Sequence, residues 1–169
     1  MNPTEELIGA AGLAFLNPAD RPVFARMVHR LRSARQALLF AECLPASRPA
    51  LELVLALGLL PERRIQAIEP GAPGWGDFLG GSLDLSDAVV RIAGLDGDGF
   101  DETARALNLA RDTCFRPGVR AFVWVMAGGL ERLPWLAPDL WRYRSAAHRL
   151  RTQPLALVPF PWPAHRGTS

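Results

Sequence analysis

Lysine is absent from this sequence of 169 residues, and all 19 of its basic residues are arginines. With 17 acidic residues the formal net charge is only +2, too small for the basic excess that nucleic-acid or membrane-surface binding requires. We ascribe the arginine bias, together with the abundant Ala, Gly, Pro and Leu, to a GC-rich bacterial genome. We therefore expect no nucleic acid and no membrane among the partners.

Cysteine is scarce: only Cys43 and Cys114 occur, far apart and without a second Cys or His at metal-ligand spacing. This pattern excludes a disulfide framework and a zinc site built on the usual motifs. Long apolar runs are lacking as well, because Glu52 interrupts the longest one, at residues 51–60. Residues 1–15 contain two glutamates and no basic residue, unlike a signal peptide. We therefore expect a cytoplasmic protein.

Short apolar runs alternate with helical patterns along the rest of the chain. Four runs predict strands, at residues 37–41, 64–69, 88–93 and 121–126. Helices are expected at about residues 4–15, 17–31, 49–60, 101–115 (capped by Asp101) and 128–135, with one helical turn in the loop 70–82. Residues 138–150 are expected to form either a last helix or an irregular closing segment.

This alternation predicts an α/β fold, a three-layer sandwich with a mostly parallel sheet of four or five strands. It is the architecture of a P-loop NTPase domain, here without a phosphate-binding loop. We expect a single domain over residues 1–150 and an irregular tail over residues 151–169, which contains Pro154, Pro159, Pro161 and Pro163. In such sheets ligands bind beyond the carboxyl ends of the strands, so the loops that follow the strands are the places to look for chemistry.

The loop after the first strand, residues 42–49, lacks what a phosphate-binding loop needs. It has no glycine to let backbone N–H groups wrap around a phosphate, and no lysine to balance the phosphate charge. Pro45 and Pro49 remove two further backbone donors. Arg48 could supply charge but not the cradle. We therefore expect no ATPase activity and no bound cofactor.

The loop after the third strand carries residues that suit metal binding. Asp96 and Asp98 follow the third strand, where a Walker-B acid would lie, and two carboxylates there suit a divalent cation. Asp-Gly pairs also form turns, and a surface turn is the interpretation we favour.

Cys43 follows the first strand, as catalytic nucleophiles often do. A thiol nucleophile needs a base, and the candidates are His29, His148 and His165. We favour a buried, inert thiol instead. The sequence thus assigns no catalytic residue and no metal ligand.

The tryptophans are candidates for either the core or a docking patch. Trp124 lies within a predicted strand and is expected in the core. Trp75, Trp135 and Trp141 lie at the ends of elements, and core packing is expected for each, with a docking patch as the alternative. Trp162, in the proline-rich tail, is the best candidate for an exposed aromatic that anchors a partner.

Several segments resemble a known bacterial domain. They are Leu107-Asn108-Leu109-Ala110-Arg111-Asp112, a strand that ends in Trp124-Val125, Ala137-Pro138-Asp139-Leu140-Trp141-Arg142-Tyr143-Arg144-Ser145, and, less specifically, residues 17–24 and 64–66. Over residues 17–150 the chain resembles the P-loop-like N-terminal domain of bacterial multidomain proteins, where it often precedes tetratricopeptide repeats. Those proteins are similar to the STAND class of signalling NTPases, but this domain has lost its nucleotide site.

The resemblance implies a scaffold or adaptor in bacterial signalling or anti-phage defence, and it assigns no catalytic residues. Two features depart from the family pattern. Ala146-Ala147-His148 replaces the usual aromatic or aliphatic ending, and no repeat array follows. We therefore expect the domain to stand alone and its partner, a repeat-containing or effector protein, to be a separate chain.

A non-catalytic interaction module is the function we expect. It would contact an acidic partner through residues 107–112 and 139–151. The partner-binding candidates are Arg111, Trp141, Arg142, Tyr143, Arg144, Arg149, Arg151 and Trp162. The alternative is a sensor that binds a nucleotide or another anion at the strand ends without hydrolysis, through Arg48 and the helix start at Gly128-Gly129.

Overall fold

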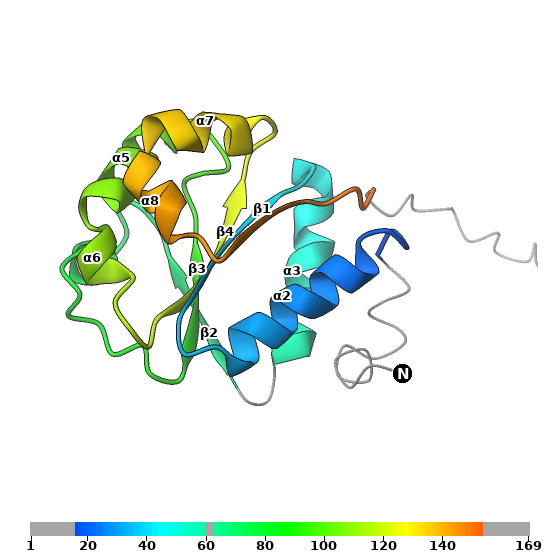
Figure 1. Cartoon of the computed structure of the whole chain (residues 1–169), viewed down its shortest axis with the longest axis horizontal. Helices are drawn as coiled ribbons and strands as arrows, with labels where there is room; N and C mark the ends of the chain where they lie inside the picture. Colours follow the sequence, from blue (N-terminus) through cyan, green and yellow to red (C-terminus); the bar gives the residue numbers. More distant parts are fainter. Residues whose placement is uncertain (1–15, 60–62, 154–169) are drawn as a thin grey trace, which may run out of the picture.

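A computed structural model describes residues 16–59 and 63–153, which form a five-stranded sheet between two layers of helices (Figure 1). The strands are β1 (Ala37–Glu42), β2 (Arg64–Ile68), β3 (Ala88–Ile92), β4 (Arg120–Val125) and β5 (Ala146–Arg149). Their order in the sheet is β2-β3-β4-β1-β5, and every neighbouring pair is parallel. The α/β sandwich predicted from the sequence is confirmed.

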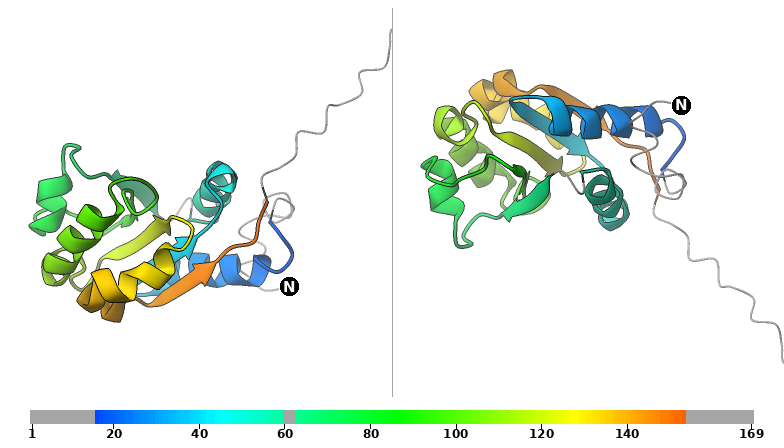
Figure 2. Two further views of the ribbon diagram at one scale, coloured as in Figure 1. Left: turned by 90° about the horizontal axis from the view of Figure 1, so that it is seen from above. Right: turned by 90° about the horizontal axis from the view of Figure 1, so that it is seen from below.

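The two faces of the sheet are covered by different parts of the chain (Figure 2). Helices α2 (Arg21–Ser33) and α3 (Arg48–Leu59) cover one face, and the short 3-10 helix η1 (Pro45–Ser47) leads into α3. The later helices lie on the other face: α4 (Trp75–Leu79), α5 (Phe100–Leu109), α6 (Arg111–Cys114), α7 (Gly129–Leu136) and α8 (Pro138–Tyr143). Each helical layer packs against the sheet and forms a separate hydrophobic cluster with it.

The predicted strands have the burial expected of a sheet covered on both faces. In β1, residues 37–41 are all buried, and in β4 residues 121–125 are all buried. Trp124 is 1% exposed and packs edge-on against Phe122, so its predicted place in the core is confirmed. Strand β2 lies at the sheet edge, where only Ile68 is fully buried, and this explains its alternating sequence.

Helix α2 follows its amphipathic pattern. Phe24, Met27, Val28 and Leu31 are buried against the sheet. His29 and Arg30 lie outside this buried set and are exposed. Its first turn contains Pro22, which a helix tolerates there because that N–H has no helical partner.

The predicted helix 101–115 is in fact two helices, α5 and α6, which meet at Ala110. Ala110 has φ −95° and ψ 7°, outside the helical region, and the chain changes direction there. The predicted cap was also wrong. Gly99 precedes α5, and Asp101 lies inside the first turn, where its charge favours the helix dipole.

Residues 138–150, for which the sequence allows either a helix or an irregular segment, form helix α8 followed by strand β5. Strand β5 pairs with β1 in the register Leu39↔Ala146 to Glu42↔Arg149. Its sequence, Ala-Ala-His-Arg, has little intrinsic preference for a strand, so the extended form depends on pairing with β1.

A buried polar cluster ties the last described residues to the start of α2. The carboxylate of Asp20, 2% exposed, accepts hydrogen bonds from the Arg151 backbone N–H at 2.7 Å and the Thr152 hydroxyl at 2.6 Å. The Ser47 hydroxyl donates to the Thr152 carbonyl at 2.6 Å. Residues 151 and 152, predicted to begin the tail, are therefore bonded to the domain. The predicted helix 4–15 and the tail from residue 154 lie outside the described residues.

No helix within residues 16–59 and 63–153 combines the length and the apolar character needed to cross a membrane.

Candidate functional site

In the loop after β1, polar groups bond to other groups of the same chain instead of facing a ligand. It folds as η1, in which the Ser47 backbone N–H donates to the Leu44 carbonyl at 2.9 Å. Arg48, at the start of α3, forms an ion pair with Asp96 in the loop after β3. The positive charge that could have attracted a phosphate at this edge is therefore balanced within the chain.

A carboxylate of the chain already occupies the start of α7. Glu42, at the end of β1, accepts a hydrogen bond from the Leu130 backbone N–H at 3.3 Å. Arg149 lies 3.5 Å from the same carboxylate and also pairs with Glu131 in the first turn of α7. Because a helix N-terminus attracts anions, Glu42 takes the place that an anionic ligand would use.

The loop after β3 is a turn closed by its own aspartate, as favoured from the sequence. Asp96 accepts a hydrogen bond from the Gly94 backbone N–H at 3.0 Å, while Asp98 is exposed. Gly94 has φ +92°, a conformation in which a side chain would be strained, and a Cβ there would meet Pro70 and Thr103 at 2.7 Å. Among the described residues, no three His, Cys, Asp or Glu side chains are grouped to hold a metal ion.

Both cysteines are buried and their thiols resist ionisation. Burial raises the pKa of Cys43 to about 11, although the positive charge of Arg48 lowers it in part. Burial likewise raises the pKa of Cys114 to about 12. The charged groups that act on Cys43 are Arg48, Glu52 and Glu42, with no histidine among them. The geometry supports the inert thiol favoured from the sequence.

We expect neither thiol to react with an aromatic disulfide reagent while the protein is folded. With a pKa of about 11, only about one Cys43 in a thousand is a thiolate at pH 8. The release of coloured thiolate at pH 8 should therefore be negligible before denaturant is added and should correspond to two thiols afterwards. Rapid reaction of one thiol in the native protein would contradict the burial described here.

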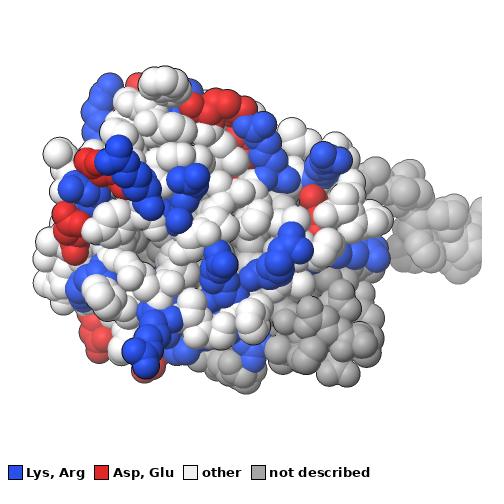
Figure 3. Space-filling model, viewed as in Figure 1, with Lys and Arg blue, Asp and Glu red and all other residues white. Residues whose placement is uncertain are grey.

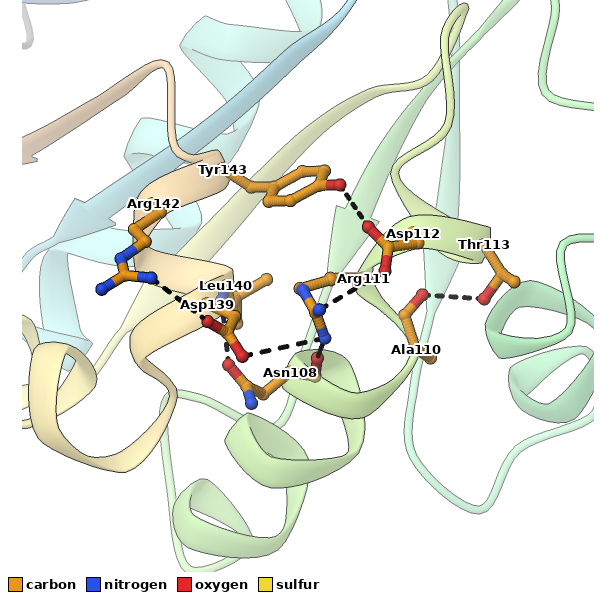
Figure 4. Close-up of polar contacts among 9 residues, drawn as sticks. All are labelled: Asn108, Ala110, Arg111, Asp112, Thr113, Asp139, Leu140, Arg142 and Tyr143. Carbon is orange, nitrogen blue, oxygen red and sulfur yellow. Dashed lines mark hydrogen bonds and ion pairs between the residues drawn. The ribbon is translucent and has the colours of Figure 1, made fainter.

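Two of the segments that carry the family resemblance, residues 107–112 and 137–145, pack against each other (Figure 4). Leu107 of α5 and Leu140 of α8 are both fully buried in one cluster. The Asn108 side-chain oxygen accepts a hydrogen bond from the Leu140 backbone N–H at 2.9 Å, which fixes the first turn of α8 against α5. These motifs therefore hold the helical layer together.

Charged and aromatic groups of the same segments extend this contact across α5, α6 and α8 (Figure 4). The Arg111 guanidinium lies 3.4 Å from Asp112 and 3.9 Å from Asp139. Asp139 also lies 3.7 Å from Arg142, and the Tyr143 hydroxyl donates to Asp112, which raises the pKa of Tyr143. Three of the partner-binding candidates, Arg111, Arg142 and Tyr143, thus have partners inside the chain.

The remaining partner-binding candidates differ in the contacts that their side chains make within the chain. The Arg144 guanidinium stacks over the Trp141 ring, 3.9 Å from its centroid, and Trp141 is half-buried against Phe40. Arg149 is paired with glutamates, whereas the Arg151 side chain is exposed and pairs with no carboxylate of the described chain. Trp162 lies outside the described residues.

Two exposed apolar side chains beside α8 were not among the partner-binding candidates, although a docking patch was the alternative for Trp135. Trp135 is 88% exposed, so its expected packing in the core was wrong, and Leu109 is 82% exposed. Helix geometry gives the reason for Trp135, because Leu133, two residues earlier, is buried and lies about 200° away around α7. Both side chains belong to helices that pack against α8.

A groove of about 590 Å³ lies between α2 and β5, on the opposite face from α8. Its lining includes Arg26, His29 and Arg30 of α2 and His148 of β5. Over α2 and the neighbouring edge of the sheet, the surface shows basic side chains and few acidic ones (Figure 3). The sequence separates His148 from α2 by more than a hundred residues, so no local pattern could have revealed the groove.

No family model matches this chain, and no curated protein matches it significantly. Among solved structures, the chain is similar to the RuvB Holliday junction branch migration motor of Thermotoga maritima, with a TM-score of 0.47 and 16% sequence identity. The match covers 80% of this chain and 46% of that one, so the chain spans less than half the length of this neighbour. A likeness of this degree says nothing about activity.

Proposed function

We propose that this chain is a non-catalytic protein–protein interaction domain, an adaptor or scaffold in bacterial signalling or anti-phage defence. One observation carries the proposal. At the carboxyl edge of the sheet, where α/β domains bind their ligands, the charged side chains beyond β1 and β5 pair with groups of the same chain, Arg48 with Asp96 and Glu42 with Arg149. What remains exposed is suited to contacting another protein.

The docking surface that we propose surrounds α8, and we call it the α8 surface: Leu109, Trp135, Trp141, Arg142, Tyr143 and Arg144. Trp135 supplies the largest exposed apolar side chain described, and tryptophan is enriched among residues that dominate binding energy. Arg144, stacked on Trp141 and without a carboxylate partner in the described chain, is held ready for an acidic group. An exposed apolar anchor and a cation without a carboxylate partner suit a partner surface that carries acidic groups.

The setting in bacterial signalling or defence rests on the resemblance to the inactive STAND-type domain. The partner would be a repeat-containing or effector protein in a separate chain, and Trp162 would be a further contact. The alternative, a nucleotide sensor at the strand ends, has less support, because Arg48 and the start of α7 already bind Asp96 and Glu42.

The α8 surface can be tested once crosslinking in the source cells has identified a partner and the complex has been rebuilt from purified chains. Trp135→Ala and Arg144→Ala should each weaken the complex about tenfold or more, because truncating such anchors removes roughly 2 kcal/mol of binding energy. Leu57→Ala is the matched control: Leu57 is also an exposed apolar residue, but it lies on α3, across the sheet. Titration calorimetry would provide the dissociation constants.

Two results would count against the proposal. Unchanged affinity for both α8 variants would remove the α8 surface from the interface. Hydrolysis of ATP or GTP by the purified chain with Mg²⁺, lost in a variant of the strand-end residues such as Arg48→Ala, would show a catalytic domain.

A further inference from the structure

The α2–β5 groove brings together basic groups from two distant parts of the chain. Arg26 and Arg30 are four residues apart on α2 and so project from the same side of the helix. His148 projects from β5 toward the same face of the sheet, and its pKa is lowered by burial and then by the positive charges of Arg26 and Arg30. Each lines the groove, and the lining contains no aspartate or glutamate.

These groups differ from the arginines of the domain that have carboxylate partners. Within the described chain, ion pairs engage Arg48, Arg91, Arg105, Arg111, Arg132, Arg142 and Arg149. No described carboxylate pairs with Arg26, Arg30 or His148. Arg30 donates one hydrogen bond to the Ser145 carbonyl at 2.6 Å, which positions its guanidinium and leaves further N–H groups free.

Positive groups held together without a counterion repel one another, and after burial, the largest cause, this repulsion further lowers the pKa of His148. A bound anion would relieve it. Guanidinium groups match oxyanions especially well, because their planar N–H donors can bind two oxygens at once. The chemistry of the groove therefore favours an anion that offers several oxygen acceptors.

The shape of the groove favours a small molecule over a large flat partner. Its volume, about 590 Å³, lies within the range of roughly 300–1,000 Å³ found for small-molecule sites. Met27, Leu39 and Ala146 give it an apolar part beside the cations. A ligand with an anionic end and a less polar body would satisfy both parts.

We propose that the α2–β5 groove binds a small molecule that carries a phosphate-type oxyanion, with Arg26 and Arg30 as its charged contacts. The site is separate from both the ion-paired residues at the strand ends and the α8 surface. It would give the domain a ligand-binding capacity that does not depend on a phosphate-binding loop.

Titration calorimetry with inorganic pyrophosphate on the full chain tests this site. The unchanged chain should bind, and Arg26→Gln should weaken binding about tenfold through loss of a charge-assisted contact. Arg26 is exposed, so this substitution should leave the fold intact. Arg105→Gln, an equal loss of charge on α5, and Arg48→Gln, at the strand ends, should leave the affinity unchanged.

Nuclear magnetic resonance provides a second readout at His148. The charged groups facing it are Arg26 and Arg30 of α2, while its partner on β1, Ala41, carries no charge. A bound oxyanion favours the protonated imidazole, so saturating pyrophosphate should raise the pKa of His148 toward its ordinary value or above. The ring of His148 should show this shift in the unchanged chain and lose most of it in Arg26→Gln.

Three results would overturn the proposal. The first is an absence of binding heat and of any shift at His148. The second is binding that Arg48→Gln weakens and Arg26→Gln does not, which would place the anion at the strand ends. The third is a polyglutamate peptide that binds in an Arg26-dependent way while pyrophosphate does not, which would make the groove a contact for an acidic protein segment.

Discussion

Asp20→Ala is expected to lower the free energy of unfolding by about 3 kcal/mol, the largest effect of any substitution considered for this domain. The carboxylate is buried and accepts the Arg151 backbone N–H and the Thr152 hydroxyl at 2.7 and 2.6 Å. Removing it leaves both donors without their acceptor in a region that water does not reach freely. Urea unfolding followed by circular dichroism would measure the loss.

Asp98→Ala is the matched control for this substitution, since Asp98 is exposed and forms no ion pair within the described residues. Its removal should change stability by less than about 0.5 kcal/mol. A double-mutant cycle with Thr152→Val should show strong coupling, because the two side chains share one hydrogen bond. Equal and small effects of Asp20→Ala and Asp98→Ala would mean that the buried cluster does not stabilise the domain.

Gly129→Ala is expected to destabilise the domain by about 2 kcal/mol, within the range for overpacking a well-filled core. A Cβ on Gly129 would lie 2.4 Å from Val125 Cγ1 and 2.8 Å from Phe100 Cε2. Both neighbours are buried, at 2% exposure each, so neither can move aside without displacing the cluster around it. The start of α7 must therefore shift, and with it the Leu130 N–H that binds Glu42.

Gly76→Ala is the control for Gly129→Ala, because Gly76 also lies in the first turn of a helix, but a Cβ there would meet no atom within 4 Å. Alanine there should be neutral or should stabilise by up to about 1 kcal/mol, since it restricts the unfolded chain. The difference between the two midpoints of denaturation isolates the steric effect. If Gly129→Ala and Gly76→Ala have equal midpoints of denaturation, the core accommodates the added Cβ at residue 129 without a loss of stability.

The parts of the fold that could be predicted are those whose pattern is local. Residues 37–41 are continuously apolar because β1 is buried on both faces, and α2 repeats its apolar residues because one side of the helix faces the sheet. Strand β5 has no such pattern. Its extended form comes from β1, more than a hundred residues earlier, and no property of Ala-Ala-His-Arg requires it.

The candidate sites show the same division. The absence of a phosphate-binding loop could be predicted directly, but the ion pairs at the strand ends join residues far apart in the sequence, as Arg48 and Asp96 do. Arg111 and Tyr143 were chosen for their chemistry, and the structure shows that this chemistry is partly used within the chain. Trp135 could have been found, because helical spacing from Leu133 already places it on the outward side of α7.

The position of β5 also bears on how the chain acquires its structure. Strand β1, synthesised early, lies in the sheet between β4 and β5, which are synthesised last among the strands of the described residues. One side of β1 therefore lacks a neighbouring strand until residue 149 has been synthesised. The hydrogen bond between Thr152 and Asp20 likewise cannot form until residue 152 has been synthesised. Contacts this distant along the chain form slowly, since a long loop must close before any of them contributes. Until then a row of unpaired backbone groups beside buried residues is open to other nascent chains, and this sheet is completed only after β5 has been synthesised.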